Sequence, residues 1–138
     1  MNDFTLDNAD QILREVMPGC VGLLQIVVEK LGENEATLSM PVSDAACREG
    51  GIFAGQAIAA LADSSMCCAL WCDGRGRRPV ATVDLHVTYM RAVGNESLLA
   101  RAKVVRSGRT LSFATVQLVG SESGQLAATA VGTFAWPA

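Results

Sequence analysis

The sequence is poor in charged and aromatic residues, and it contains a single histidine. Charged residues make up 18% of the 138 residues and aromatic residues 5%, whereas half of the chain is hydrophobic. Disordered segments have the opposite composition, so disorder is excluded. The chain is long enough for one domain with its own core and too short for two. An apolar surplus in so small a domain also favours an oligomer, because a monomer cannot bury all of it.

A basic excess, a long apolar run and a secretory leader are all missing. The net charge is −3 at pH 7, whereas a nucleic-acid-binding protein needs a basic face. The apolar stretch at residues 57–62 is interrupted by Asp63, and no run approaches the roughly 18 residues of a membrane span. The first residues lack the basic start and apolar segment of a signal peptide. These absences predict a cytoplasmic protein that binds neither nucleic acid nor membranes.

The cysteines do not form a recognisable metal site. Five cysteines are present, and an odd number in a cytoplasmic chain predicts free thiols. Cys68 and Cys72 stand four residues apart on a predicted helix, but His86 is the only histidine, so a zinc ligand set is missing. We therefore expect no metal and interpret the cysteines as buried apolar side chains. A catalytic pair of a cysteine with His86 stays open, although no motif supports it.

Apolar periodicity predicts the element order α-ββ-α-ββββ. The N-terminal segment, residues 1–19, carries a short helix over residues 9–17. Asp7 or Asn8 can cap this helix, and Pro18 ends it. Short connections between consecutive strands imply an antiparallel sheet, so the α+β fold is one sheet wrapped around one apolar helix. The remaining elements are strands at 21–31 and 36–42, a helix at 57–72, and strands at 80–90, 97–106, 110–119 and 125–136.

Alternation within the strands predicts which side chains share a face. In the strand at 80–90, Thr82, Asp84 and His86 are expected on one face. Asp84 and His86 then form either a base–histidine dyad or a polar contact with another subunit. In the strand at 36–42, one face is apolar, and we expect other subunits to cover it: Ala36, Leu38 and Met40.

Asp63 is the strongest chemical clue in the sequence. It is the only charged residue in the helix at 57–72. A buried, unpaired carboxylate is costly, so Asp63 needs a partner, a raised pKa or a position facing a pocket. The alternative is that Asp63 lies with Ser64 on one exposed edge of the helix.

A glycine-containing loop leads directly into this helix. Residues 50–56 read GGIFAGQ and place Gly55 in the first helical turn, where N–H groups have no intrahelical partner. Such N–H groups and the helix dipole stabilise a developing oxyanion. Asp63 lies about 12 Å further along the helix axis, so the two groups meet one small atom only if they come from different subunits. Alternatively, Gly50 and Gly51 simply form a tight turn.

Four stretches together resemble the hotdog-fold acyl-CoA thioesterases of the phenylacetate-pathway (PaaI-like) group. The loop GGIFAGQ followed by ALAD is similar to the group's N-x-x-G-x-x-H-G-G loop and its helical L-x-D. The similarity extends over nearly all of residues 20–136. The four stretches are GGIFAGQ with ALAD at 60–63, ATVDLHVTYMRA at 81–92, VRSGRT at 105–110 and the strand at 127–134.

The resemblance implies a single hotdog domain over residues 1–138 that forms a homodimer, often doubled to a homotetramer as a dimer of dimers. It also implies hydrolysis of acyl-CoA thioesters with no cofactor, since CoA is part of the substrate. Asp63 matches the catalytic carboxylate, acting as general base or nucleophile. Gly55, from the opposite subunit, matches the glycine whose N–H polarises the thioester carbonyl. Thr82 matches a residue that positions water, and Cys67 falls where some relatives carry a water-binding threonine.

Three positions depart from the family pattern. Ala54 replaces the motif histidine, Gln56 replaces its second glycine, and Arg48 replaces the upstream asparagine. Ala54 has no side-chain donor for a carbonyl, and Gln56 is a candidate replacement. The departures keep a non-hydrolytic protein that binds acyl-CoA or an aromatic acid as an alternative. A hydratase or dehydratase is disfavoured, because His86 lies outside the loop and the helix.

Basic and apolar residues suggest where the substrate binds. Arg106 and Arg109 flank a turn and are candidates to bind CoA phosphates. The cluster at 75–78 is a second candidate, or a solvated loop. Three apolar residues are expected to line a pocket for an apolar or aromatic acyl group: Phe53, Met66 and Leu70.

Overall fold

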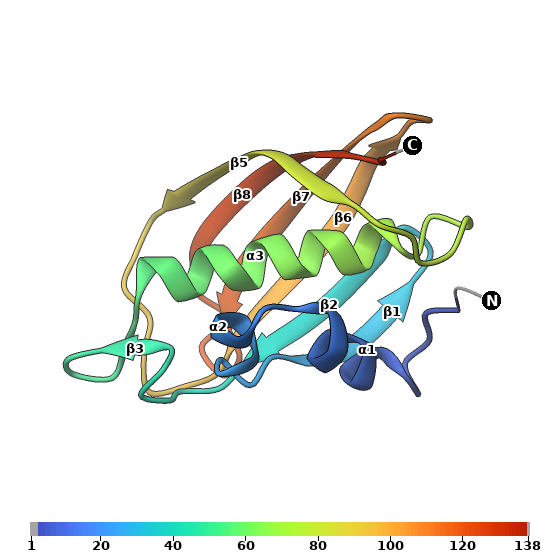
Figure 1. Ribbon diagram of the computed structural model, residues 1–138. Helices are drawn as coiled ribbons and strands as arrows, with labels where there is room; N and C mark the ends of the chain where they lie inside the picture. Colours follow the sequence, from blue (N-terminus) through green and yellow to red (C-terminus); the bar gives the residue numbers. More distant parts are fainter. Residues whose placement is uncertain (1–2, 138) are drawn as a thin grey trace.

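The computed structural model describes residues 3–137 as one curved antiparallel sheet around a long helix (Figure 1). The six strands of the sheet lie in the order β1-β2-β6-β7-β8-β5. This confirms the expected hotdog architecture. The elements are α1 (Ala9–Val16), α2 (Gly19–Gly22), β1 (Val27–Gly32), β2 (Glu35–Met40), β3 (Cys47–Arg48), β4 (Ile52–Phe53), α3 (Gly55–Leu70), β5 (Ala81–Tyr89), β6 (Leu98–Ser107), β7 (Leu111–Gly120) and β8 (Leu126–Ala135).

The helix α3 is buried on most sides, as its apolar sequence predicts. Leu61 and Met66 are fully buried, and the buried hydroxyl of Ser65 donates to the carbonyl of Leu61 at 2.6 Å. Strands β2, β6 and β7 pack against the helix. The apolar face of β2 therefore lies against α3 in the same chain, and the expectation that other subunits cover it is wrong. That face consists of Ala36, Leu38 and Met40.

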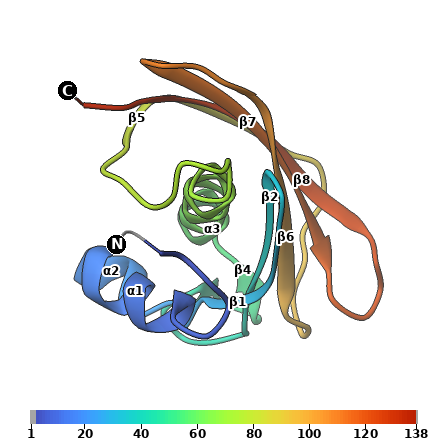
Figure 2. The same ribbon diagram turned by 90° about the vertical axis from the view of Figure 1, so that its right-hand side faces the viewer.

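The N-terminal segment differs most from the sequence prediction. The first helix is confirmed as α1, but the side chain of Asn8 accepts the N–H of Thr5 instead of capping the helix. The strand expected over 21–31 begins only at Val27, because the chain first forms the short helix α2 after Pro18. Figure 2 shows α1 and α2 beside α3, on the side away from β6 and β7. Asp10 on α1 accepts the N–H of Val28 at 2.8 Å and so fixes this segment to β1.

Strand β5 lies at one edge of the sheet and contains a β-bulge. The register with β8 shifts between Thr82 and Asp84. Thr82 is paired with Phe134, which is fully buried, whereas Asp84 is paired with Thr133 on the outer face. Paired residues project from the same face of a sheet, so Thr82 faces α3 and Asp84 does not. The prediction that Thr82 and Asp84 share a face is wrong, because strict alternation does not hold across a bulge.

The structure shows the state of the cysteines and the lengths of the helices. All five cysteines are free thiols, as predicted, but only Cys67 and Cys68 are buried, and the interpretation as a buried side chain is wrong for Cys20, which is exposed on the short helix α2. In the part of the chain that the structure describes, no three acidic, histidine or cysteine side chains are grouped to hold a metal ion. Over residues 3–137, no helix has both the length and the hydrophobicity to cross a bilayer.

Candidate active site

Asp63 lies at the centre of the candidate site, half-buried on α3. The hydroxyl of Thr82 on β5 donates to its carboxylate, at 3.0 Å from one oxygen and 3.3 Å from the other. The thiol of Cys67, one helical turn further along, lies 3.8 Å from the nearer carboxylate oxygen. Thr82 reaches Asp63 only because the β-bulge turns it toward the helix. The structure thus brings together three residues that the sequence placed in the site.

The surroundings of Asp63 make it a stronger base than an exposed aspartate. Burial raises the pKa of Asp63, and the hydrogen bonds from Thr82 and Cys67 offset part of this rise. Burial, together with the neighbouring carboxylate, also raises the pKa of Cys67 far above that of an ordinary thiol. Cys67 therefore stays protonated as a donor to Asp63 and is not a thiolate nucleophile.

The histidine takes no part in this cluster. His86 is paired with Val131 on the outer face of the sheet, and its ring nitrogen lies 3.4 Å from the hydroxyl of Thr88. Asp84 shares that outer face, but the hydrogen-bond partner of His86 is Thr88. The geometry gives no support to a Cys–His pair or to a dyad of Asp84 with His86.

A cavity of about 540 Å³ opens beside Asp63. Helix α3 supplies one wall, and the segment after it supplies a second, which includes Arg77 and Thr82. The third wall comes from the end of α1 and from α2. Sequence reasoning missed this wall, because about forty residues separate it from Asp63 and it carries no motif. Its residues are Val16, Met17, Pro18 and Val21.

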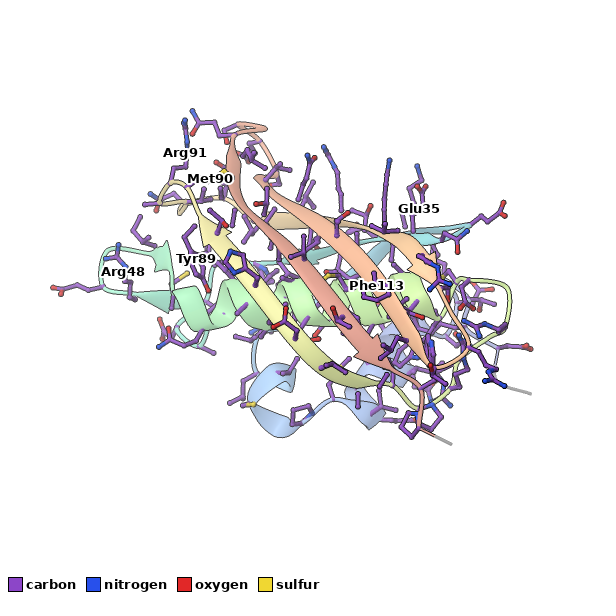
Figure 3. All side chains as sticks on the ribbon, turned by 90° about the horizontal axis from the view of Figure 1, so that it is seen from above. Glu35, Arg48, Tyr89, Met90, Arg91 and Phe113 are labelled. Atoms are coloured by element: carbon purple, nitrogen blue, oxygen red, sulfur yellow. The ribbon has the colours of Figure 1, made fainter. Side chains whose placement is uncertain are left out.

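Gly55 lies in a second cavity, of about 360 Å³, at the start of α3. The hydroxyl of Tyr89 donates to the carbonyl of Gly55 at 2.8 Å, and Arg48 and Phe53 also line this cavity. Figure 3 shows Arg48, Tyr89 and Arg91 at this end of the molecule. Phe53 therefore lines a cavity, but not the cavity of Asp63.

The two expected halves of the site are separate within one chain. Asp63 does not line the Gly55 cavity, and Gly55 does not line the Asp63 cavity. Met66 and Leu70 are fully buried and line neither cavity, so their prediction as pocket residues is wrong. They face inward, where an apolar helix packs on its own sheet.

The positions that depart from the family pattern lie at the start of α3. Ala54 is the N-cap residue, and its N–H donates to the carbonyl of Ala46 at 2.9 Å. Gln56 is exposed in the first turn and lines neither of the two cavities. Arg48 does line the Gly55 cavity. Of the two side chains that carry donors here, only that of Arg48 is placed beside Gly55.

The two basic segments form one surface. Asp73 forms ion pairs with Arg75 at 2.8 Å and with Arg78 at 2.6 Å. Burial tends to raise the pKa of Asp73, but its hydrogen bonds from Arg78, Ser107 and Arg75 outweigh burial and hold the pKa well below its usual range. Arg75 also donates to Ser107 and to the carbonyl of Gly108, so the loop after α3 lies against the turn of Arg106 and Arg109.

Arg77 differs from the other arginines of that loop. The Nε of its guanidinium is buried and has no hydrogen-bond partner within residues 3–137. Arg77 also lines the Asp63 cavity. Arg78, in contrast, is held by Asp73 and stacks on Trp136, 3.5 Å from the ring centroid. Arg106 and Arg109 are exposed.

A half-buried carboxylate on the central helix of a hotdog scaffold, beside a cavity, agrees with the class of thioesterases that the sequence stretches resemble. The chain belongs to the Thioesterase superfamily, whose sequence profile matches residues 50–127. It is 31% identical over 131 residues to acyl-coenzyme A thioesterase 13 of Mus musculus, covering 89% of this chain and 93% of the mouse protein. These findings confirm the family that the sequence stretches predicted, and the PaaI-like group is consistent with them.

Solved structures agree with this placement. A crystal structure of zebra fish thioesterase superfamily member 2 has a TM-score of 0.86 at 32% identity, covering 98% of this chain and 100% of that chain. Thioesterase superfamily member 2 from Mus musculus has a TM-score of 0.81 at 26% identity, covering 94% and 96%. Both comparisons include the N-terminal segment, which lies outside residues 50–127.

Proposed function

We propose that this protein hydrolyses acyl-CoA thioesters to the free acid and CoA, with Asp63 as the catalytic carboxylate. The observation that carries the proposal is the contact of Asp63 with Thr82 and Cys67 beside an open cavity. As a general base, Asp63 takes a proton from a water that attacks the thioester carbonyl carbon. The C–S bond then breaks, and the leaving sulfur takes up the proton. As a nucleophile, Asp63 attacks the carbonyl carbon, the C–S bond breaks and CoA leaves as a thiolate. Water then hydrolyses the mixed anhydride to the acid and the free carboxylate, and the thiolate takes up the released proton.

The proposal places Gly55 of a partner subunit at the thioester carbonyl. Its N–H lies in the first turn of α3, where the helix supplies no partner for it, so it can stabilise the developing oxyanion. Strand β5 is an edge strand, and Val83 on it is 59% exposed. Pairing of two β5 strands would give a homodimer that joins the separate cavities. A homotetramer built as a dimer of dimers stays a prediction.

The basic surface suggests where CoA lies. Arg106 and Arg109 flank the turn that contacts the loop of Arg75, so cations gather near the Arg77 end of the Asp63 cavity. Phosphate groups bind to such cations. We therefore place the nucleotide of CoA at this end. The reaction needs no cofactor besides water, and we propose that it takes place in the cytoplasm.

A second candidate function is binding of acyl-CoA or an aromatic acid without hydrolysis. Ala54 supports it, since this N-cap residue has no side-chain donor for the carbonyl. Hydrolysis, in contrast, would depend on the N–H of Gly55, with Arg48 as the further donor beside it. The two functions differ in whether CoA is released.

The test is a panel of CoA thioesters incubated with the protein and a thiol reagent. We expect wild type to release CoA and Asp63→Asn to lose turnover by at least a hundredfold. Asp84→Asn, a change on the outer face of β5, is the matched control and keeps activity. Tight binding without CoA release by wild type supports the second function. Unchanged turnover in Asp63→Asn contradicts the assignment of Asp63.

A further inference from the structure

The cavity beside Asp63 adjoins a third, smaller cavity at the N-terminal segment. This cavity measures about 260 Å³. Met17, Val21 and Ser64 line both cavities, so the two adjoin at these residues. The smaller cavity is bounded mostly by apolar residues from α1, α2 and the start of β1. Its other lining residues are Leu13, Arg14, Gly22, Gln25, Ile26 and Val27.

The two ends of the combined cavity differ in polarity. Arg77 and Arg78 line only the cavity of Asp63, and they lie beside the basic surface. Met17 and Val21 line the opposite, shared end together with Ser64, and most of the residues there are apolar. A thioester has a matching polarity, with phosphates on one side of the sulfur and a hydrocarbon chain on the other. A substrate that places its carbonyl at Asp63 therefore directs CoA toward Arg77 and its acyl chain toward Met17.

We propose that the N-terminal segment forms the acyl-chain pocket and that Met17 and Val21 set the chain length it accepts, the substrates being thioesters of straight aliphatic acids. This inference rests on the proposed function, since it places the carbonyl at Asp63. The segment lies outside the region matched by the family profile, which begins at residue 50. The profile therefore includes α3 but not the wall that faces it, whereas the two thioesterase structures align with nearly the whole chain.

The physical basis is burial of methylene groups. Each methylene removed from water adds about a fourfold gain in binding, until the chain reaches the end of the pocket. Met17 and Val21 are both only partly buried, so space remains beside them for a ligand. Asp10 on α1 ties the segment to β1 by accepting the N–H of Val28. A wall held in this way can limit the length of the acyl chain that fits.

The experiment compares kcat/KM over saturated acyl-CoA substrates from acetyl to palmitoyl. Val21→Phe fills the junction, and we expect it to lower kcat/KM at least tenfold for the long chains, through KM, with its smallest effect on acetyl-CoA. Met17→Ala enlarges the junction and shifts the optimum to longer chains. Leu23→Phe is the matched control, because Leu23 lies on the same segment, is 67% exposed and lines neither cavity.

A binding measurement separates this inference from the proposed function. Calorimetry with alkyl-CoA thioethers, which are not hydrolysed, gives the affinity for each chain length in wild type and in Val21→Phe. Loss of the length dependence in Val21→Phe supports the pocket even in a protein that does not turn over thioesters. If Val21→Phe changes every chain length equally, or changes none, the pocket lies elsewhere. Circular dichroism and the unfolding temperature confirm that the variants fold.

Discussion

The Asp63 cavity and the Gly55 cavity differ in how much of the chemistry one chain completes. Beside Asp63, the same chain supplies the hydroxyl of Thr82 and the thiol of Cys67, so the carboxylate is already oriented. At Gly55, Tyr89 engages the carbonyl and leaves the N–H to a ligand. In the proposed mechanism, one chain therefore orients the base by itself, whereas the oxyanion site acts only on a substrate held by another subunit.

The most direct test of the two halves of the proposed site is to inactivate each half in a separate chain. Gly55→Pro removes the proposed donor N–H and suits the first position of a helix, where proline is favoured. Ala54 is already extended, as the residue before a proline must be. We expect a loss of turnover of about 10²–10³-fold. Gly55→Ala is the control: it keeps the N–H, and its added carbon would lie 3.5 Å from Tyr89, an ordinary contact.

Mixing the two inactive variants tests whether the halves come from different subunits. A heterodimer of Gly55→Pro with Asp63→Asn has one intact site and one doubly inactive site. Random exchange of subunits should restore about a quarter of the wild-type specific activity, because half of the dimers are then mixed and each has one of two sites. Activity that stays at the level of the separate variants would show that both groups act from the same chain.

Thr82→Val tests the orientation of the base. We expect a loss of about ten- to a hundredfold in kcat, with a smaller change in KM. Because the hydrogen bond from Thr82 lowers the pKa of Asp63, its removal should also move the acid limb of the pH–rate profile to higher pH. Thr82→Ser keeps the hydroxyl and should restore both. Thr88→Val, on the outer face of the same strand, is the control.

The contrast between Thr82 and Asp63 shows how much of the site the sequence predicts. Asp63 is visible in the sequence because it is the only charge in an apolar helix. The motif around it identifies the family, and the order of the larger elements follows from periodicity. Thr82 is identified only by the resemblance, since strict alternation places it on the wrong face. A one-residue bulge changes the face of a side chain without changing the composition of the strand.

The N-terminal segment shows a second limit of sequence reasoning. The apolar residues after Pro18 satisfy a strand pattern, but the structure uses them for α2 and for the wall opposite Asp63. Local propensity is weak over so few residues, and packing against α3 decides their conformation. Val21 and Asp63 line the same cavity although about forty residues separate them in the sequence. Periodicity does not reveal a proximity over such a separation.

Arg48→Gln tests whether the Gly55 half supplies more than one N–H group. Arg48 lines the Gly55 cavity in place of the asparagine of the family pattern. Its exposed guanidinium is only a moderate electrostatic contributor in water, so we expect a three- to tenfold rise in KM for acyl-CoA with little change in kcat. Arg101→Gln, on the exposed face of β6, is the control. A large fall in kcat would instead make Arg48 a direct partner of the carbonyl.

The smallest expected effect is on the stability of the fold, and it concerns only the half of the site that contains Asp63. Burial raises the pKa of Asp63, so the folded protein binds the proton more tightly than the unfolded chain does. Stability from this group is present at low pH and is lost as pH rises through the raised pKa. Asp63→Asn removes that loss and should stabilise the fold at pH 7 by about 1 kcal/mol, or roughly 3 °C in Tm.

The pH dependence of this gain identifies its origin. As the pH falls through the pKa of Asp63, wild type becomes protonated, and the difference in Tm between it and Asp63→Asn should shrink toward zero. Asp84→Asn, an exposed change, should leave Tm nearly constant at each pH. A gain in Asp63→Asn that persists unchanged at low pH would assign it to packing and not to charge. A gain that disappears shows that the fold keeps a costly charge at Asp63, as a base held ready for catalysis requires.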